Sequence, residues 1–262
     1  MRNRIFWGAV LIILGLIFLF SYQMGFSIWS LIWPFAIIVV GCWILLIPFL
    51  SRGIEIMKDE LSFPLEGVNQ ATIKIEHGAG TINLTAADLP DKLLTGSFLG
   101  GVKSMVSSSE GKCRIKLQSK VEFINFLPRF QKEQRLIWDL SVNRTIPLKI
   151  KMETGASDNH LDLRGSKLKE LHLETGASTS ELFLPEDAGE MKIHIESGAS
   201  TIKIHVPQNV VAKIKVGGLI GKTINTDRFQ KIGDLYQSAD FENVKNRAEI
   251  EIESGVGSIE IN

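Results

Sequence analysis

The sequence predicts a helical membrane hairpin followed by an all-β domain, a solenoid-like stack of coils of about 21 residues with two strands each. Three observations predict this. Residues 1–50 hold only two charged side chains, Arg2 and Arg4, but four of the five tryptophans. The remaining chain alternates apolar and polar residues, as half-buried strands do. One glycine-containing motif recurs five times in it. We therefore expect a hairpin over 1–50, a linker over 51–65 and a β-repeat domain over 66–262.

Two uncharged runs, 5–22 and 28–50, form the predicted hairpin. A helix of 18 residues spans roughly 27 Å, enough for the hydrocarbon core of a bilayer. A cleaved signal peptide is the alternative for the first run, but no small-residue cleavage site follows it and a second run comes at once. Gly8 and Gly15 share one helical face, and with Gly41 on the second run they would allow close helix packing.

Basic residues predict the orientation of the hairpin. Arg2 and Arg4 precede it, Arg52 and Lys58 follow it, and the turn between the runs has none. The positive-inside bias then predicts a multi-pass protein of the cell membrane with both ends in the cytoplasm, the soluble domain included.

The repeated motif consists of alternating apolar residues, a Glu, a polar residue, a Gly with small neighbours, and a second alternating stretch. It occurs as IKIEHGAGTINL (73–84), IKMETGASDNHLDL (150–163), LHLETGASTSELFL (171–184), IHIESGASTIKIHV (193–206) and IEIESGVGSIEI (250–261). Its glycines are Gly78, Gly155, Gly176, Gly198 and Gly255. One such unit cannot bury its own apolar face, so neighbouring units must stack.

A single unit shows the expected geometry. Leu171 and Leu173 point inward, the chain reverses at Gly176, and Leu182 and Leu184 line the opposite wall. We expect the corner glycines to take a positive φ. Stacking would place His172 and His194 in one outward column between Lys151 and Lys215. The neighbouring column would hold Glu153, Glu174 and Glu196.

Three stretches interrupt the repeats. Residues 99–109 are rich in Gly and Ser and predict a loop or an edge. Residues 226–246 lengthen the last repeat, with Phe229, Tyr236 and Phe241 expected to cover one end of the stack. Residues 112–135 are basic and aromatic. Their candidate membrane or partner contacts are Phe123, Phe126, Arg129, Phe130, Lys132 and Arg135, the alternative being a long loop whose aromatics cap the core.

Composition and motifs exclude several function classes. The 29 basic and 29 acidic residues give no net charge, which argues against a nucleic-acid binder. The stretch 216–223 lacks the first glycine and the following helix of a phosphate-binding loop. The His and Glu columns could hold a metal, but solvated charge pairing is the preferred interpretation. No catalytic constellation emerges, so we expect no enzyme, no cofactor and no metal.

The motifs resemble a known bacterial family. The hairpin, with Gly8, Gly15 and Trp33-Pro34, is similar to the membrane region of LiaI/LiaF-like proteins. The repeats, including WDLSVNRTIPLKIKMETGAS (138–157), resemble the toast-rack domain. The last 70 residues, with Pro207 and the closing GVGSIEI, resemble the LiaF C-terminal domain. The chain departs from LiaF-type members in its fewer predicted membrane helices and its longer repeat region.

The resemblance implies a non-enzymatic, membrane-bound accessory protein of the cell-envelope stress response. LiaF-type members hold a membrane histidine kinase in check, so a sensor histidine kinase and the membrane are the expected partners. Association with further copies of the chain stays open. The alternative function is an adhesin-like, scaffold or ligand-binding β-solenoid.

Overall fold

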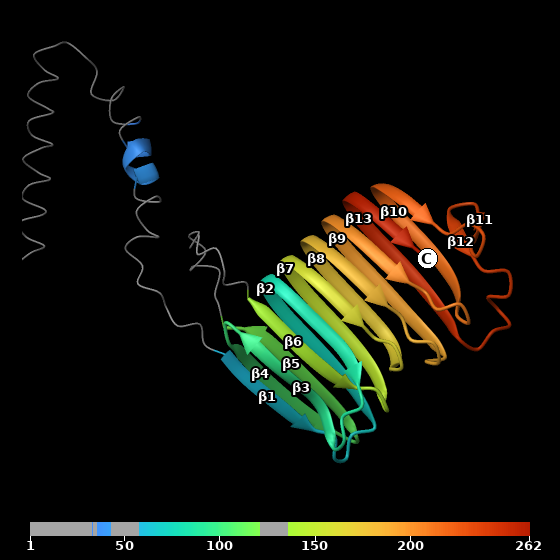
Figure 1. Ribbon diagram of the computed structural model, residues 1–262, viewed down its shortest axis with the longest axis horizontal. Coiled ribbons are helices and arrows are strands. Elements are labelled where there is room, and N and C mark those ends of the chain that lie inside the picture. The colour runs from blue at the N-terminus through green and yellow to red at the C-terminus, as the bar shows by residue number, and fades with distance from the viewer. Residues whose placement is uncertain (1–32, 34–35, 43–57, 121–135) are drawn as a thin grey trace, which may run out of the picture. The chain divides into compact units, whose positions relative to one another are not determined.

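The domain is built from long strands that bend in the middle (Figure 1). The computed structural model describes residues 33, 36–42, 58–120 and 136–262, without the side chains of 219 and 220. The described strands form one sheet. They are β1 (Lys58–Pro64), β2 (Gln70–Ala87), β3 (Lys92–Leu99), β4 (Val102–Ser109), β5 (Lys112–Ser119), β6 (Ile137–Asn143), β7 (Pro147–Asp162), β8 (Lys167–Phe183), β9 (Glu190–His205), β10 (Val211–Ile224), β11 (Gln230–Ile232), β12 (Leu235–Gln237) and β13 (Arg247–Ile261).

Each repeat forms one continuous strand with two arms. In β8 the arm before the corner buries Leu171 and Leu173, the arm after it buries Leu182, and Leu184 directly follows the strand, all four fully buried. The same alternation of buried and outward residues runs along β2, β7 and β9. The apolar side chains of both arms belong to one core. The predicted all-β stack is therefore confirmed, although its two strands per coil are the two arms of a single bent strand.

Strand order in the stack differs from strand order in the chain. The sheet runs β1-β3-β6-β2-β7-β8-β9-β13-β10-β12-β11, and β4 pairs with β5, which pairs with the first arm of β2. Strands β2, β7, β8, β9, β13 and β10 are parallel neighbours. The last strand of the chain, β13, thus inserts between β9 and β10. The repeat at the C-terminus completes the middle of the stack and leaves β10 beyond it.

Aromatic residues are buried near both ends of the stack of strands. Trp138 of β6 and Phe98 of β3 are fully buried and meet edge to face, with ring centroids 5.0 Å apart. Phe229 is fully buried, Phe241 is nearly so, and Tyr236 of β12 is half-buried against the core. These last three are the residues expected from the sequence to cover an end.

The corner glycines do not adopt the expected conformation. Positive φ angles occur at several described glycines, but Gly176, Gly198 and the three equivalent residues are not among them. Their requirement is steric. A Cβ at Gly176 would lie 2.8 Å from the carbonyl oxygen of Gly155, and one at Gly198 would lie 2.7 Å from that of Gly176. Every corner glycine after Gly78 therefore makes room for the backbone of the coil before it in the stack.

The predicted membrane localisation with two spanning helices needs correction. Within the described part of the chain, helix is found at 33 and 36–42, and no helix there is long and apolar enough to cross a bilayer. Gly8 and Gly15 lie outside the described residues. A Cβ added to Gly41 would meet nothing within 4 Å. Residues 58–64, expected to belong to the linker, form β1.

Candidate functional site

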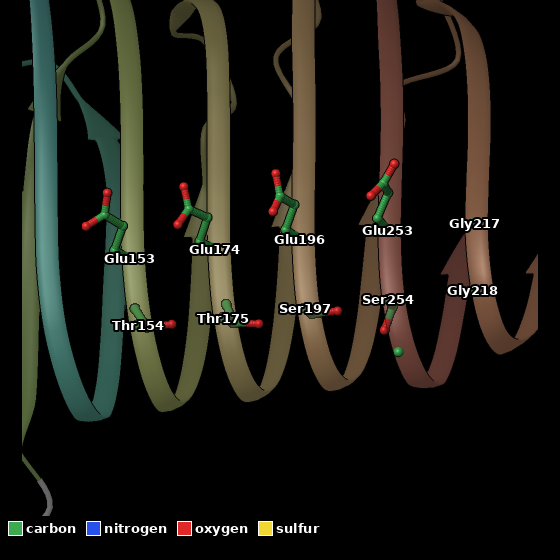
Figure 2. Close-up of a pocket in the computed structure, with 11 residues that line it drawn as sticks. Glu153, Thr154, Glu174, Thr175, Glu196, Ser197, Gly217, Gly218, Glu253 and Ser254 are labelled. Atoms are coloured by element: carbon green, nitrogen blue, oxygen red, sulfur yellow. The ribbon is translucent and has the colours of Figure 1, made fainter.

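A groove of about 850 Å³ runs along the stack beside the corners. Figure 2 shows its glutamates side by side on successive strands, each followed along the chain by a hydroxyl residue of the next column. Its lining residues come from β7, β8, β9, β13 and β10: Glu153, Thr154, Glu174, Thr175, Glu196, Ser197, Gly217, Gly218, Glu253, Ser254 and Gly255. The groove is thus made by corresponding positions of the repeat.

Strand register aligns five glutamates in a single file. We call Glu76, Glu153, Glu174, Glu196 and Glu253 the carboxylate column, since each pairs with the next across neighbouring strands. Parallel strands lie about 4.8 Å apart, so unpaired carboxylates at this spacing would repel one another. The column therefore requires positive charge nearby.

Lys151, two residues before Glu153, supplies that charge, and His172, two residues before Glu174, adds a hydrogen bond. Lys151 Nζ lies 3.2 Å from Glu153 and 3.1 Å from Glu174, and His172 Nε2 lies 2.6 Å from Glu174. Hydrogen bonds from His172 and Lys151 lower the pKa of Glu174 below its usual value. In turn, hydrogen bonds to Glu174 and Glu153 raise the pKa of Lys151. The predicted surface of paired charges is present in this part of the stack.

The two predicted histidines stack on each other. The rings of His172 and His194 are 5.0 Å apart and nearly parallel. The sequence expected Lys215 next along this column, but the insertion of β13 places Glu251 between His194 and Lys215. The predicted column is therefore confirmed on β7, β8 and β9. It is wrong at Lys215, where β13 is inserted.

This insertion leaves negative charge in excess toward β13. Among the ion pairs found in the described residues, His194 is the one partner of Glu196, at 2.8 Å. Lys215 Nζ is 2.7 Å from Glu251, and its pKa is raised mainly by that hydrogen bond, with a weaker contribution from Glu253. Lys215 therefore pairs mainly with Glu251. The negative charges of Glu196 and Glu253 are then less neutralised than those of the other members of the column.

Hydroxyl groups that line the groove form hydrogen bonds across the corners after the first. Thr175 Oγ1 and Ser178 Oγ are 2.9 Å apart, and the equivalent pair Ser197 and Ser200 is 2.8 Å apart. In β13 the residue in register with Ser200 is Gly257, and Ser254 instead bonds Ser200 at 3.2 Å. The first two bonds link the two arms of one strand, and the Ser254–Ser200 bond links neighbouring strands β13 and β9.

The first corner of the series uses a different solution. His77 occupies the position of Thr154 and is buried edge to face against Trp138, with centroids 4.6 Å apart. Neither ring nitrogen has a hydrogen-bond partner among the described residues. Burial lowers the pKa of His77 to about 4, so the ring is neutral at pH 7.

A second charged cluster lies on the arms after the corners. His160 Nδ1 is 3.3 Å from Glu181 and His205 Nε2 is 3.0 Å from the same carboxylate. The ring of Phe183 stacks on His205 at 4.2 Å. Spacing within the motif suggests no partner for His160 or His205, because the predicted columns lie on the first arms.

The remaining predicted site residues have these outcomes. Gly78, Gly155, Gly176, Gly198 and Gly255 are the stacked corners. The stretch 216–223 is part of strand β10. No group of three or more His, Cys, Asp or Glu in the described part of the chain is placed to hold a metal. The candidate contacts Phe123, Phe126, Arg129, Phe130, Lys132 and Arg135 lie outside the described residues.

The first of two solved structures compared with the chain supports the fold. A candidate cell adhesion protein from Clostridium sporogenes ATCC 15579 is similar with a TM-score of 0.68 and 21% identity, covering 79% of this chain and 99% of its own. A candidate adhesin from Bacteroides fragilis NCTC 9343 gives a TM-score of 0.26 and 12% identity over 80% and 100%. None of the curated proteins matches.

The sequence itself matches a family. Residues 52–205, more than half of the chain, match the family described as the N-terminal domain of toast_rack, DUF2154. The match covers the corners of β2, β7, β8 and β9, whose repeated motif carried the resemblance noted in the sequence. The chain belongs to the toast-rack family.

Proposed function

We propose that the chain is a non-enzymatic, adhesin-like binding module whose corner groove receives a basic segment of a partner protein. The observation that carries this proposal is the carboxylate column along the groove, most negative at Glu196 and Glu253. The name of the Clostridium neighbour agrees with an adhesin-like role, although at 21% identity the similarity speaks for the fold. A stack of fixed strands offers such a partner a regular file of acceptors.

The expected binding is multivalent and sensitive to salt. An exposed ion pair contributes only about 0.2–1 kcal/mol, so one lysine on one glutamate would not hold a partner. Several pairs along an extended segment add to a usable affinity. Because the groove is open to solvent, ions at physiological strength screen these contacts over about 8 Å. A basic segment with several lysines or arginines is the partner that this geometry suits.

A labelled decalysine peptide tests the proposal by fluorescence anisotropy. The full chain is compared with a variant carrying Glu174→Gln, Glu196→Gln and Glu253→Gln. The matched control carries Glu66→Gln, Glu186→Gln and Glu242→Gln, three exposed positions outside the groove with the same change in net charge. We expect the groove variant to bind at least about tenfold more weakly and the control to stay within about twofold. Equal losses in the two variants would refute a role for the groove.

Control of a sensor histidine kinase in the envelope stress response is the second function, implied by the family resemblance. Membership of the toast-rack family is compatible with it, and no described residue selects a kinase. It therefore stays a prediction. A stress-promoter reporter in a strain lacking this gene tests it, and an unchanged reporter with no kinase co-purifying would refute it.

A further inference from the structure

Strand β4 is a long edge of the sheet. Its eight residues, Val102 to Ser109, pair antiparallel with Lys112 to Ser119 of β5 in continuous register without a bulge. Among the described strands β4 pairs with β5 alone. Its other side therefore presents a row of backbone N–H and C=O groups that no described strand uses.

Both faces of this edge strand are open as well. Every residue after Val102 is exposed, including Met105 at 55% and Val106 at 51%. Val106 stands opposite Ile115, which is fully buried. The face of β5 that carries the core therefore continues onto β4, where no described residue covers it.

The edges at β1 and at β11 with β12 carry protective features, whereas the second arm of β10 also has no described strand on its outer side. Strand β1 carries Lys58, Asp59 and Glu60 and ends at Pro64. At the far end, β11 and β12 are only three residues long. Charges, proline and short length are the devices that keep sheet edges from pairing. Strand β4 lacks them except for Lys103, so its composition favours pairing rather than preventing it.

We propose that β4 pairs antiparallel with β4 of a second copy. The two-fold axis passes between the Met105 residues of the two copies or between their Val106 residues. Residues opposite each other in an antiparallel pair share a face, which leaves these two central registers. Lys103 then meets Ser107 in the first and Ser109 in the second. No like charges face each other, and the two exposed apolar side chains lie on or beside the axis. The inference is independent of the groove.

The affinity should be moderate, because eight residues a side bury less than the roughly 1,600 Å² of a standard interface. Sedimentation of the full chain tests the proposal through Met105→Lys and Val106→Lys. Val256→Lys is the control, since Val256 is also apolar and is 58% exposed at a corner. In one register each test lysine faces the equivalent lysine of the second copy across the axis. In the other register it lies beside the axis. We expect the wild type to dimerise from 29.1 kDa chains. Each test variant should dimerise at least about tenfold more weakly, whereas the control should match the wild type.

A monomeric wild type at about 100 µM, well above the usual range of specific dimers, would overturn the proposal. So would test variants that dimerise as well as the control. A second measurement fixes the register in a chain carrying Cys42→Ser. Oxidation should cross-link the Met105→Cys variant, or the Val106→Cys variant, to the same residue of a second copy. The Val256→Cys variant should stay uncross-linked. Cross-linking at neither β4 position, or species larger than a dimer, would place the association elsewhere and contradict two-fold pairing.

Discussion

Corner glycines act through what they lack rather than through an unusual φ. Gly155, Gly176, Gly198 and Gly255 each sit directly beside the carbonyl oxygen of the corner glycine before them in the stack, whereas Gly78, the first of the series, has no such neighbour. A methyl group at an inner member would force neighbouring coils apart. Since the coils share one core, such a local shift disturbs the packing on both arms.

Gly176→Ala should lower the free energy of unfolding by about 1–3 kcal/mol, because its Cβ would lie 2.8 Å from the Gly155 carbonyl oxygen. Gly78→Ala is the matched control, since a Cβ there meets nothing within 4 Å. It should be neutral or stabilising by up to about 1 kcal/mol, through the reduced entropy of the unfolded chain. Urea unfolding measures both. Equal destabilisation by the two substitutions would contradict the steric explanation.

His77 makes stability depend on acidity. Its pKa falls from 6.5 in the unfolded chain to about 4 in the folded one, so protons bind the unfolded state more tightly. Stability from this residue is full above pH 6.5 and decreases as the pH falls toward 4, by up to roughly 3 kcal/mol at 1.36 kcal/mol per pKa unit.

Replacing His77 by Phe should therefore reduce the difference between urea unfolding free energies at pH 7 and pH 4.5. Exposed His160→Gln is the control and should alter that difference much less. An unchanged pH dependence in His77→Phe would show that His77 is not the group that titrates.

At the scale of elements, β13 has the most demanding position. It lies between β9 and β10, with Ile252 in register with Ile195 on one side and Val216 on the other. The last residues of the chain therefore complete the middle of the sheet. In the folded stack, β10 joins the other long strands only through its pairing with β13.

Ile252→Ala should cost about 2–5 kcal/mol of unfolding free energy, the usual range for a buried Ile reduced to Ala. Glu253→Ala, one residue on and exposed, should stay within about 0.5 kcal/mol. Thermal and urea unfolding of the two variants compare the positions. Similar effects of the two substitutions would contradict the burial of Ile252 in the core.

Local periodicity explains which of these features the sequence could predict. Alternation placed Leu171, Leu173, Leu182 and Leu184 in the core, and equal spacing of the motifs placed His172 next to His194. The order of strands in the chain could not predict that β13 inserts. Whether β10 or β13 lies next to β9 depends on contacts between distant segments. The expected positive φ at Gly176 was wrong because close approach between coils also requires glycine. The buried contact of His77 with Trp138 joins residues in β2 and β6 and has no sequence signature.

For the whole molecule, the groove and the stack depend on each other. The carboxylate column has five members only because β13 brings Glu253 beside Glu196. If β10 followed β9 directly, as chain order would have it, Gly217 would take that place and the column would end at Glu196. The proposed binding surface is therefore a consequence of the strand order.

Cross-linking with a short thiol reagent tests that order most directly, in a full chain carrying Cys42→Ser. Glu196→Cys combined with Glu253→Cys places the two thiols on adjacent strands, and Glu196→Cys combined with Gly217→Cys places them two strands apart. Strands are about 4.8 Å apart, so we predict rapid cross-linking in the first pair and little in the second. Cross-linking of residue 196 to residue 217 instead of residue 253 would contradict the inserted strand and, with it, the carboxylate column.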